Sequence, residues 1–402
     1  MGKRRGNGEG AIYETKDGRW RAAATLPDGR RKYLSAATRG EVAAKLRKVQ
    51  RHVDDGLPVG TDGRAPTVET WMRHWLDNIA AHKVRASTLD GYRSKMDVRI
   101  LPTLGRYRLD RLTETHVEQW QAALLADGLA ATTVLQCHRI LSRSLTVAMQ
   151  RRMVGRNVCT LVDAPSGVRE EVKPLSSADA RAVLAAAAGQ PNEARWSVAL
   201  ALGLRQGEAL GLAWDCVDLD AGTLAVRRAL QRRRWTHGCE SPKKCGRAAR
   251  CPQRSGGGLH LVPPKSRAGR RVITLPKPLV DALKAHRSKQ SQARLAAGEV
   301  WADPFDGVAL LFTSPTGRPV DPAADWKSWH ALLKAAEVPR ARLHDARHTA
   351  ASLLLEKGVP ARVVMEILGH SQISLTLGTY SHVAPVLQRE AADHMSSALG
   401  WS

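Results

Sequence analysis

The first 57 residues alternate between apolar and polar positions in short runs. Asp-Gly pairs at 17–18 and 28–29 separate these runs, a signal that is typical of β-hairpins. Thr38 and Glu41 then have the spacing of a capping box at the start of a helix. Residues 1–57 are therefore predicted to form a three-stranded sheet followed by a helix. The predicted strands are Ala11–Thr15, Arg19–Leu26 and Arg31–Ala36.

A linker rich in Pro, Gly and Asp follows. In residues 67–164 the spacing of apolar residues becomes that of amphipathic helices. Large apolar side chains recur at helical spacing, which indicates a packed core rather than a surface that stacks on bases. They are Trp71, Trp75, Leu76 and Ile79. Further helices are expected from a cap at Ser87 through Val98, from an opening at Leu109–Thr113 onward, and over Ala130–Arg152. A basic helical bundle of this kind suits a DNA backbone, although the periodicity fits any four-helix domain equally well.

The remainder of the chain, residues 174–400, alternates between helical and strand patterns and is predicted to form a mixed α+β domain. The predicted strands are Thr223–Leu230, Leu259–Pro263, Arg271–Leu275 and Val308–Phe312. The expected fold class is therefore multi-domain and mainly α with small β-sheets: an N-terminal three-stranded sheet with a helix, a helical bundle and the α+β domain.

The charge of the chain is strongly positive, with 62 Lys and Arg against 38 Asp and Glu and a formal net charge of +24. Residues 1–66 contain 15 basic and 8 acidic side chains, a net of +7, and Arg227–Arg271 contains 14 and one, a net of +13. This excess predicts a polyanionic partner, with nucleic acid favoured over a membrane surface or non-specific adhesion. The sequence has no apolar run of about 18 residues and no secretory signal, so a cytoplasmic, nucleoid-associated protein is expected.

Six cysteines are expected to be thiols or metal ligands, because disulfides are rare in the cytosol. Three of them, with one histidine, lie in an insertion between two predicted strands: His237, Cys239, Cys245 and Cys251. These residue types can form a tetrahedral zinc site. The gaps exceed the usual two to four residues, so the spacing favours free thiols in a basic, Gly-rich loop over a structural zinc ion.

Leu343–His382 concentrates groups that bind phosphate and exchange protons. They are His344, Arg347, His348, His370 and Tyr380. Tyr380 is the only tyrosine after position 107, and His344 and Arg347 share one face at a predicted helix N-terminus, which favours an anion. Each residue alone is equally explained by packing. Their joint position at segment junctions favours a phosphodiester site.

Two further candidates lie upstream. Arg205 lies between two predicted apolar helices, where a buried guanidinium needs an anion as its partner. Glu208 would be that anion in a structural salt bridge, and a phosphate group would be that anion in a functional site. This segment alone favours the salt bridge. Lys265 lies in a predicted turn between strands, from which a lysine can reach the DNA minor groove or a leaving oxygen. Without further context, a solvated lysine among many basic residues explains it as well.

Four segments together resemble the tyrosine recombinases, in particular integrases of phages and integrative elements. They are LGLRQGEALGL, PPKSRAGRRVITLP, HDARHTAASLLLEKGV and LGHSQISLTLGTYSH. The resemblance covers the whole chain and implies an arm-type DNA-binding domain at 1–57, a core-binding domain at 67–164 and a catalytic domain at 174–400. Ala346 and Gly378 replace the leucine and aspartate usual in the family, and neither change removes a catalytic group.

The resemblance implies a six-residue catalytic set: Arg205, Lys265, His344, Arg347, His370 and Tyr380. Tyr380 would form a 3′-phosphotyrosyl bond, the arginines would hold the phosphate, and Lys265 would protonate the leaving oxygen. His344 would assist proton transfer and His370 would bind the phosphate. Glu208 would orient this group rather than react, and His348 would be a packed helix histidine. The implied partners are double-stranded attachment-site DNA and three further copies of the chain, with room for an accessory excision factor, and catalysis would need no metal or cofactor.

Two other functions compete with site-specific integration or excision of a mobile element. A type IB topoisomerase uses the same class of nucleophile, but the small N-terminal sheet argues against it. A non-catalytic DNA-binding regulator on a degenerate catalytic fold is disfavoured because all six residues are present.

Overall fold

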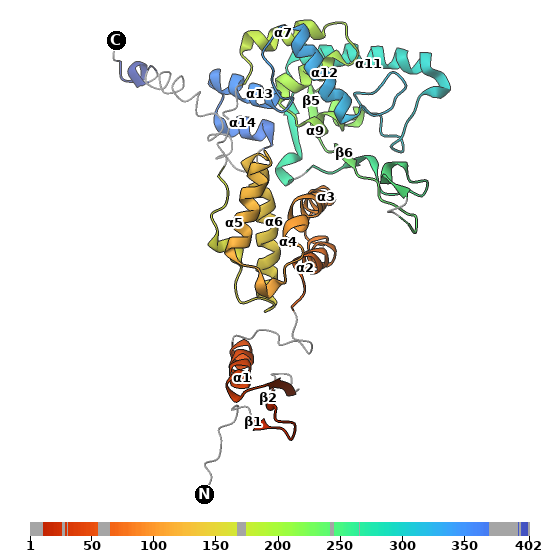
Figure 1. Ribbon diagram of the computed structural model, residues 1–402. Coiled ribbons are helices and arrows are strands. Elements are labelled where there is room, and N and C mark those ends of the chain that lie inside the picture. Colours follow the sequence, from red (N-terminus) through yellow and green to blue (C-terminus); the bar gives the residue numbers. More distant parts are fainter. Residues whose placement is uncertain are drawn as a thin grey trace. The chain divides into compact units, whose positions relative to one another are not determined.

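The computed structural model describes residues 11–25, 29, 31–54, 65–166, 174–241, 245–264, 266–369, 393 and 395–400 (Figure 1). The chain divides into two units, residues 1–169 and 170–402. Within the described residues, no helix combines the length and the apolar character needed to cross a membrane.

The N-terminal segment is an antiparallel three-stranded sheet with one helix. Its elements are β1 (Ala11–Glu14), β2 (Trp20–Thr25), β3 (Arg31–Ala36) and α1 (Arg39–Asp54). The strand order is β1-β2-β3, and α1 packs Val42 and Leu46 against the sheet around Ala22. Thr38 Oγ1 accepts a hydrogen bond from the Glu41 backbone N–H at 3.3 Å, the capping contact that the sequence predicts.

The helical bundle of the first unit consists of α2 (Val68–Trp75), α3 (Ala86–Lys95), α4 (Leu101–Leu104), α5 (Glu114–Ala126) and α6 (Ala131–Gln150). Trp71, Trp75, Leu76 and Ile79 are buried in its core, as predicted. The indole of Trp71 donates to the Ser144 carbonyl at 3.1 Å, which links α2 to α6. These tryptophans are therefore core residues rather than platforms for bases.

The predicted cap at Ser87 is wrong. The helix α3 begins one residue earlier, at Ala86, and its N-cap residue Arg85 makes no side-chain capping bond. Leu89 and Tyr92 pack against the core of the bundle, so burial rather than a cap stabilises this helix start.

The helices of the second unit in the described residues up to Gly369 are α7 (Ser177–Ala187), α8 (Glu193–Leu202), α9 (Gln206–Leu210), α11 (Lys277–Ala297), α12 (Pro322–Ala335), α13 (Asp345–Glu356) and α14 (Ala361–Leu368). Its strands are β4 (Val217–Asp218), β5 (Thr223–Val226), β6 (Ala229–Arg233), β7 (Gly258–Val262) and β8 (Arg271–Thr274). They form an antiparallel sheet β4-β5-β8 and a hairpin β6-β7.

The helix α8 is buried on both sides. Val198 and Leu202 belong to the core formed with the β4-β5-β8 sheet, α9 and α11. Trp196 and Leu200 belong to a second core with α7, α12 and α13. The loop after α8, which contains Arg205, is thus fixed from two directions. The expected mainly helical fold with small sheets is confirmed.

Two strand predictions in this unit are wrong. Thr223–Leu230 is divided at Arg227 and Arg228 into β5 and β6, which lie in different sheets. At this break Arg228 binds the side chain of Asp215, with nitrogen–oxygen distances of 2.7 and 2.8 Å. Val308–Phe312 makes only a single bridge, between Leu310 and Ala213. The α11 side chains of His286 and Gln290 occupy the Leu310 and Leu311 carbonyls that a second strand would need.

Candidate active site

The junction between α8 and α9 lies directly against α13 and α14. Gly203 ends α8 with φ of 57°, in the left-handed region that favours glycine. A Cβ atom at this position would lie 2.6 Å from Leu368 Cδ2 and 3.1 Å from Ala350 Cβ. Glycine therefore permits both the turn and the close approach that carries Arg205 to the C-terminal helices.

The guanidinium of Arg205 is held at two points. Its Nη1 donates to Glu208 Oε1 at 2.6 Å, and its Nη2 donates to the Gly369 carbonyl at 3.3 Å. The salt bridge that the sequence favours is therefore present. The Arg205 side chain nevertheless retains 36% of its exposure, so the same guanidinium remains accessible to an anion from outside.

Glu208 lies between two arginines. Its side chain is only 3% exposed, and its Oε2 accepts a hydrogen bond from Arg271 Nη2 at 3.2 Å. Burial by itself raises the pKa of Glu208, but the charges of Arg271 and Arg205 and the hydrogen bond from Arg205 hold it below its usual value. Glu208 is thus an anion that orients Arg205, the role expected of it.

Arg271 is the residue that the sequence did not single out. It donates to the Gly269 carbonyl at 3.1 Å and, through Nε, to the Ile367 carbonyl near the end of α14. Together with its bond to Glu208, these contacts join β8, α9 and α14. In the sequence, Arg271 is one of 14 basic residues between Arg227 and Arg271, and no local signal distinguishes it.

His344 and Arg347 occupy the start of α13. His344 is the N-cap residue, and Arg347 lies in the first turn with its Nη1 donating to the Gly203 carbonyl at 2.9 Å. Arg347 is 2% exposed. Arg347 thus contacts the carbonyl of Gly203, which is two residues before Arg205, and the charges of both arginines act on His344. The structure therefore brings Arg205, His344 and Arg347 together.

The electrostatics of this group favour the neutral form of His344. Partial desolvation lowers the pKa of His344, and the positive charges of Arg347 and Arg205 lower it further. The residue as a whole is exposed to solvent. A neutral imidazole that solvent or substrate can reach can accept a proton.

His348 is a packing residue. It lies one turn after His344, with the ring centroids 5.1 Å apart and the ring planes perpendicular. Desolvation and the neighbouring His344 lower the pKa of His348 to about 4. This agrees with its interpretation as a packed helix histidine.

The other three predicted site residues, Lys265, His370 and Tyr380, lie outside the described residues. Described residues next to Lys265 and His370 do contact one another. A Cβ atom on Gly369, which precedes His370, would lie 2.8 Å from the Ala268 carbonyl and 2.8 Å from Arg271 Nη1. The turn that follows Lys265 and the end of α14 are therefore in contact beside Arg205.

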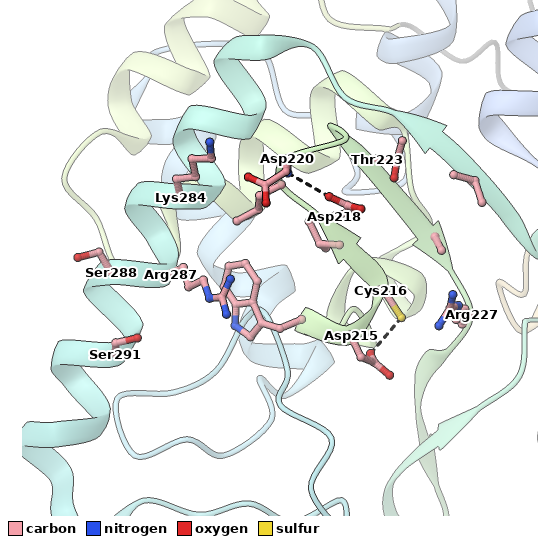
Figure 2. A pocket seen from close by; sticks show the side chains of 15 residues that line it. Asp215, Cys216, Asp218, Asp220, Thr223, Arg227, Lys284, Arg287, Ser288 and Ser291 are labelled. Atoms are coloured by element: carbon pink, nitrogen blue, oxygen red, sulfur yellow. Dashed lines mark hydrogen bonds between the residues drawn. The ribbon is translucent and has the colours of Figure 1, made fainter.

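A pocket of about 1010 Å³ lies elsewhere in the second unit, between α11 and the edge of the β4-β5-β8 sheet. Figure 2 shows Lys284, Arg287, Ser288 and Ser291 of α11 along one side, with Asp215 and Asp218 on the other. Its lining includes none of the six predicted catalytic residues. In the described part of the chain, the side chains grouped closely enough to hold a metal ion are also elsewhere, in the β6–β7 insertion: His237, Cys239, Cys245 and Cys251.

Comparison with known proteins identifies the family. The Phage integrase family matches residues 256–386, and the N-terminal SAM-like domain of phage integrases matches residues 67–125. An integrase of Saccharopolyspora erythraea is 37% identical over 97% of both chains, and an integrase of Streptomyces ambofaciens is 32% identical over 97% of both.

Solved structures share the fold at lower identity. The Tn1549 transposon integrase, in complex with a circular intermediate DNA, is 20% identical with a TM-score of 0.67 and covers 82% of this chain and 100% of its own. The lambda integrase tetramer bound to a Holliday junction is 16% identical with a TM-score of 0.56, covering 94% and 96%. On the strength of its full-length relatives, the chain belongs to the phage integrase family of tyrosine recombinases, the site-specific recombinases of phages and mobile elements.

Proposed function

We propose that this recombinase cuts and rejoins DNA through Tyr380. The phenolic oxygen attacks the scissile phosphorus, a 3′-phosphotyrosyl bond forms, and the bond from phosphorus to the 5′ oxygen breaks. A 5′-hydroxyl from a second duplex then reverses these steps and releases Tyr380. The phosphodiester energy is kept in the covalent intermediate, so no ATP is needed.

The observation that carries this proposal is the meeting of Arg205, His344 and Arg347 at the N-terminus of α13. Arg347 is anchored on the Gly203 carbonyl at 2.9 Å, and Arg205 is anchored by Glu208 at 2.6 Å while a third of it stays exposed. Two oriented guanidinium groups and a helix N-terminus together favour the negative charge that develops on a phosphate during transfer.

Proton transfer is assigned to the other members of the set. Neutral His344 takes the proton that leaves Tyr380, and Lys265 gives a proton to the departing 5′ oxygen. His370 donates a hydrogen bond to the phosphate. Because the two arginines and these donors neutralise the phosphate, we assign no catalytic metal and no cofactor.

The same assignment extends to domains and partners. Residues 1–57 bind arm-type DNA, residues 67–164 bind the core site and residues 174–400 carry out the chemistry, each on double-stranded attachment-site DNA. Related integrases are seen bound to DNA, and one as a tetramer on a Holliday junction, which supports a homotetramer here. An accessory excision factor would set the direction of the reaction on nucleoid DNA in the cytoplasm.

The test is a suicide substrate, a duplex built from the DNA junction beside the coding gene, with a nick next to the cleavage position. The wild-type protein should form a covalent protein–DNA species that survives denaturation. Tyr380→Phe should form none, while Tyr107→Phe, a matched control in the helical bundle, should behave as wild type. Absence of any covalent species with the wild type would refute the proposal, and equal cleavage of unrelated duplexes would indicate a topoisomerase-like activity.

A further inference from the structure

The insertion between β6 and β7 has a folded shape but almost no core. Of the described residues between Arg234 and Gly257, only Cys251 is fully buried, at 2% exposure. None of these residues belongs to a hydrophobic cluster. So few buried apolar side chains give little hydrophobic stabilisation, and small units of this kind are commonly stabilised by disulfides or a metal ion.

The ends of the insertion are nonetheless held in register. Thr236 and Ser255 form a reciprocal pair of backbone hydrogen bonds at 3.0 and 3.1 Å. A Cβ atom on Gly238 would lie 2.2 Å from the Gln253 carbonyl, so the two arms of the loop touch at a position where only glycine fits. This close approach brings His237 and Cys239 of one arm to Cys251 of the other.

Four ligand-bearing side chains meet at this point. One ligand atom from each of His237, Cys239, Cys245 and Cys251 lies within 4.8 Å of all the others, and Cys239 Sγ is 3.8 Å from His237 Nδ1. All three cysteines are unbridged thiols. In a tetrahedral zinc site with Zn–S distances near 2.3 Å, the sulfur atoms are about 3.8 Å apart. The most widely separated ligand atoms would therefore need to approach each other by about 1 Å to bind zinc.

We propose that His237, Cys239, Cys245 and Cys251 bind one structural Zn²⁺ ion, which holds the β6–β7 insertion in its folded shape. Three thiolates and an imidazole form a closed Cys₃His set and select a soft ion over Mg²⁺ or Ca²⁺. The bound site carries a net charge of −1, which suits its basic surroundings at Arg247, Arg250 and Arg254. The five-residue spacing argued against zinc in the sequence. In the structure, a 3-10 turn at Ala248–Arg250 lies in the gap between Cys245 and Cys251, and the Thr236–Ser255 pair holds the two arms of the loop together.

The direct test is the metal content of the full-length protein, purified without a metal-affinity tag and measured by mass spectrometry. The wild type should contain about one zinc per chain. Cys239→Ser and Cys245→Ser should lose most of it, whereas Cys216→Ser, which removes a thiol outside the cluster, should keep it. A wild type without zinc, or zinc retained in both cluster variants, would overturn the proposal.

A second measurement does not depend on how the variants fold. The wild-type protein is treated with a chelator and digested briefly with trypsin, which cuts after Arg247, Arg250 and Arg254. Cleavage in the insertion should accelerate several-fold after chelation and return to its original rate when Zn²⁺, but not Mg²⁺, is added back. Adding Co²⁺ instead should give the visible absorption of a tetrahedral thiolate site. An unchanged cleavage pattern, or a disulfide detected between cluster cysteines in place of free thiols, contradicts the proposal.

Discussion

Glu208 and Arg271 form a buried ion pair at 3.2 Å, with side chains 3% and 7% exposed. The pair connects two stretches of chain that are 63 residues apart, and Arg271 extends the connection to the Ile367 carbonyl. Glu208 in turn accepts a hydrogen bond from Arg205, so Arg271 is linked to Arg205 through Glu208. In the proposed mechanism, Arg271 would be a positioning residue.

Replacing Arg271 with Met should lower the free energy of unfolding of the catalytic domain by about 3 kcal/mol, because one partner of a buried charge pair is lost. Arg93→Met removes one partner of an exposed pair with Asp77 and should cost less than about 1 kcal/mol. Both values come from urea denaturation of the full-length protein. Equal losses in the two variants would mean that Arg271 has no special structural role.

Arg205→Lys and Arg347→Lys should each slow covalent cleavage by about 10²- to 10³-fold, because a lysine cannot present the planar fork that holds two phosphate oxygens. DNA affinity should change only a few-fold, since one phosphate contact among many is affected. Single-turnover cleavage and gel shifts separate the two effects. Arg362→Lys, on the exposed face of α14, serves as the control and should cleave normally. Parallel losses of affinity and cleavage would instead indicate a binding role.

Gly203→Ala should destabilise the protein by about 1–3 kcal/mol more than Gly189→Ala. Both glycines have positive φ, 57° and 77°, so both variants bear the cost of a left-handed alanine. Only Gly203 has a neighbour at 2.6 Å, Leu368 Cδ2, whereas Gly189 has no atom within 4 Å of its Cβ position. The comparison by thermal denaturation isolates the contact between the α8–α9 junction and α14. If the two variants are equally stable, that contact is looser than the structure shows.

Acid should weaken the second unit through His348. The pKa of this imidazole falls from about 6.5 in the unfolded chain to about 4 in the fold, so the unfolded chain binds the proton first as pH decreases. The free energy of unfolding should therefore be constant above pH 7 and decline between pH 6.5 and 4. His348→Gln cannot titrate, and its decline from pH 7 to pH 4.5 should be smaller by about 1–2 kcal/mol, a value discounted because the ring is partly solvated. Identical pH profiles would show that His348 is not desolvated.

The sequence predicts a feature well when the residues that form it are close together along the chain, and poorly when they are far apart. The Arg205–Glu208 bridge spans three residues, and helix periodicity placed Trp71 and Trp75 in a core, so both were accessible. Arg347 bonds to Gly203 across 144 residues, and the Arg271 contacts exist only when three segments meet, so no local pattern reveals them. The strand predicted at Val308–Phe312 failed for the same reason, because α11 supplies the partners for its carbonyls. The spacing of the cysteines favoured free thiols. The positions of their sulfur atoms depend on the turn at Ala248–Arg250 and on the Thr236–Ser255 pair, which the spacing does not reveal.

Tyr380 is proposed as the nucleophile, and the most direct measurement is to identify the residue that becomes bonded to DNA. The covalent complex formed on the suicide duplex is digested with nuclease and protease, and the nucleotide-bearing peptide is sequenced by tandem mass spectrometry. The expected result is a single modified peptide that carries the nucleotide on Tyr380. A nucleotide on Tyr107, on another tyrosine or on a serine would contradict the account.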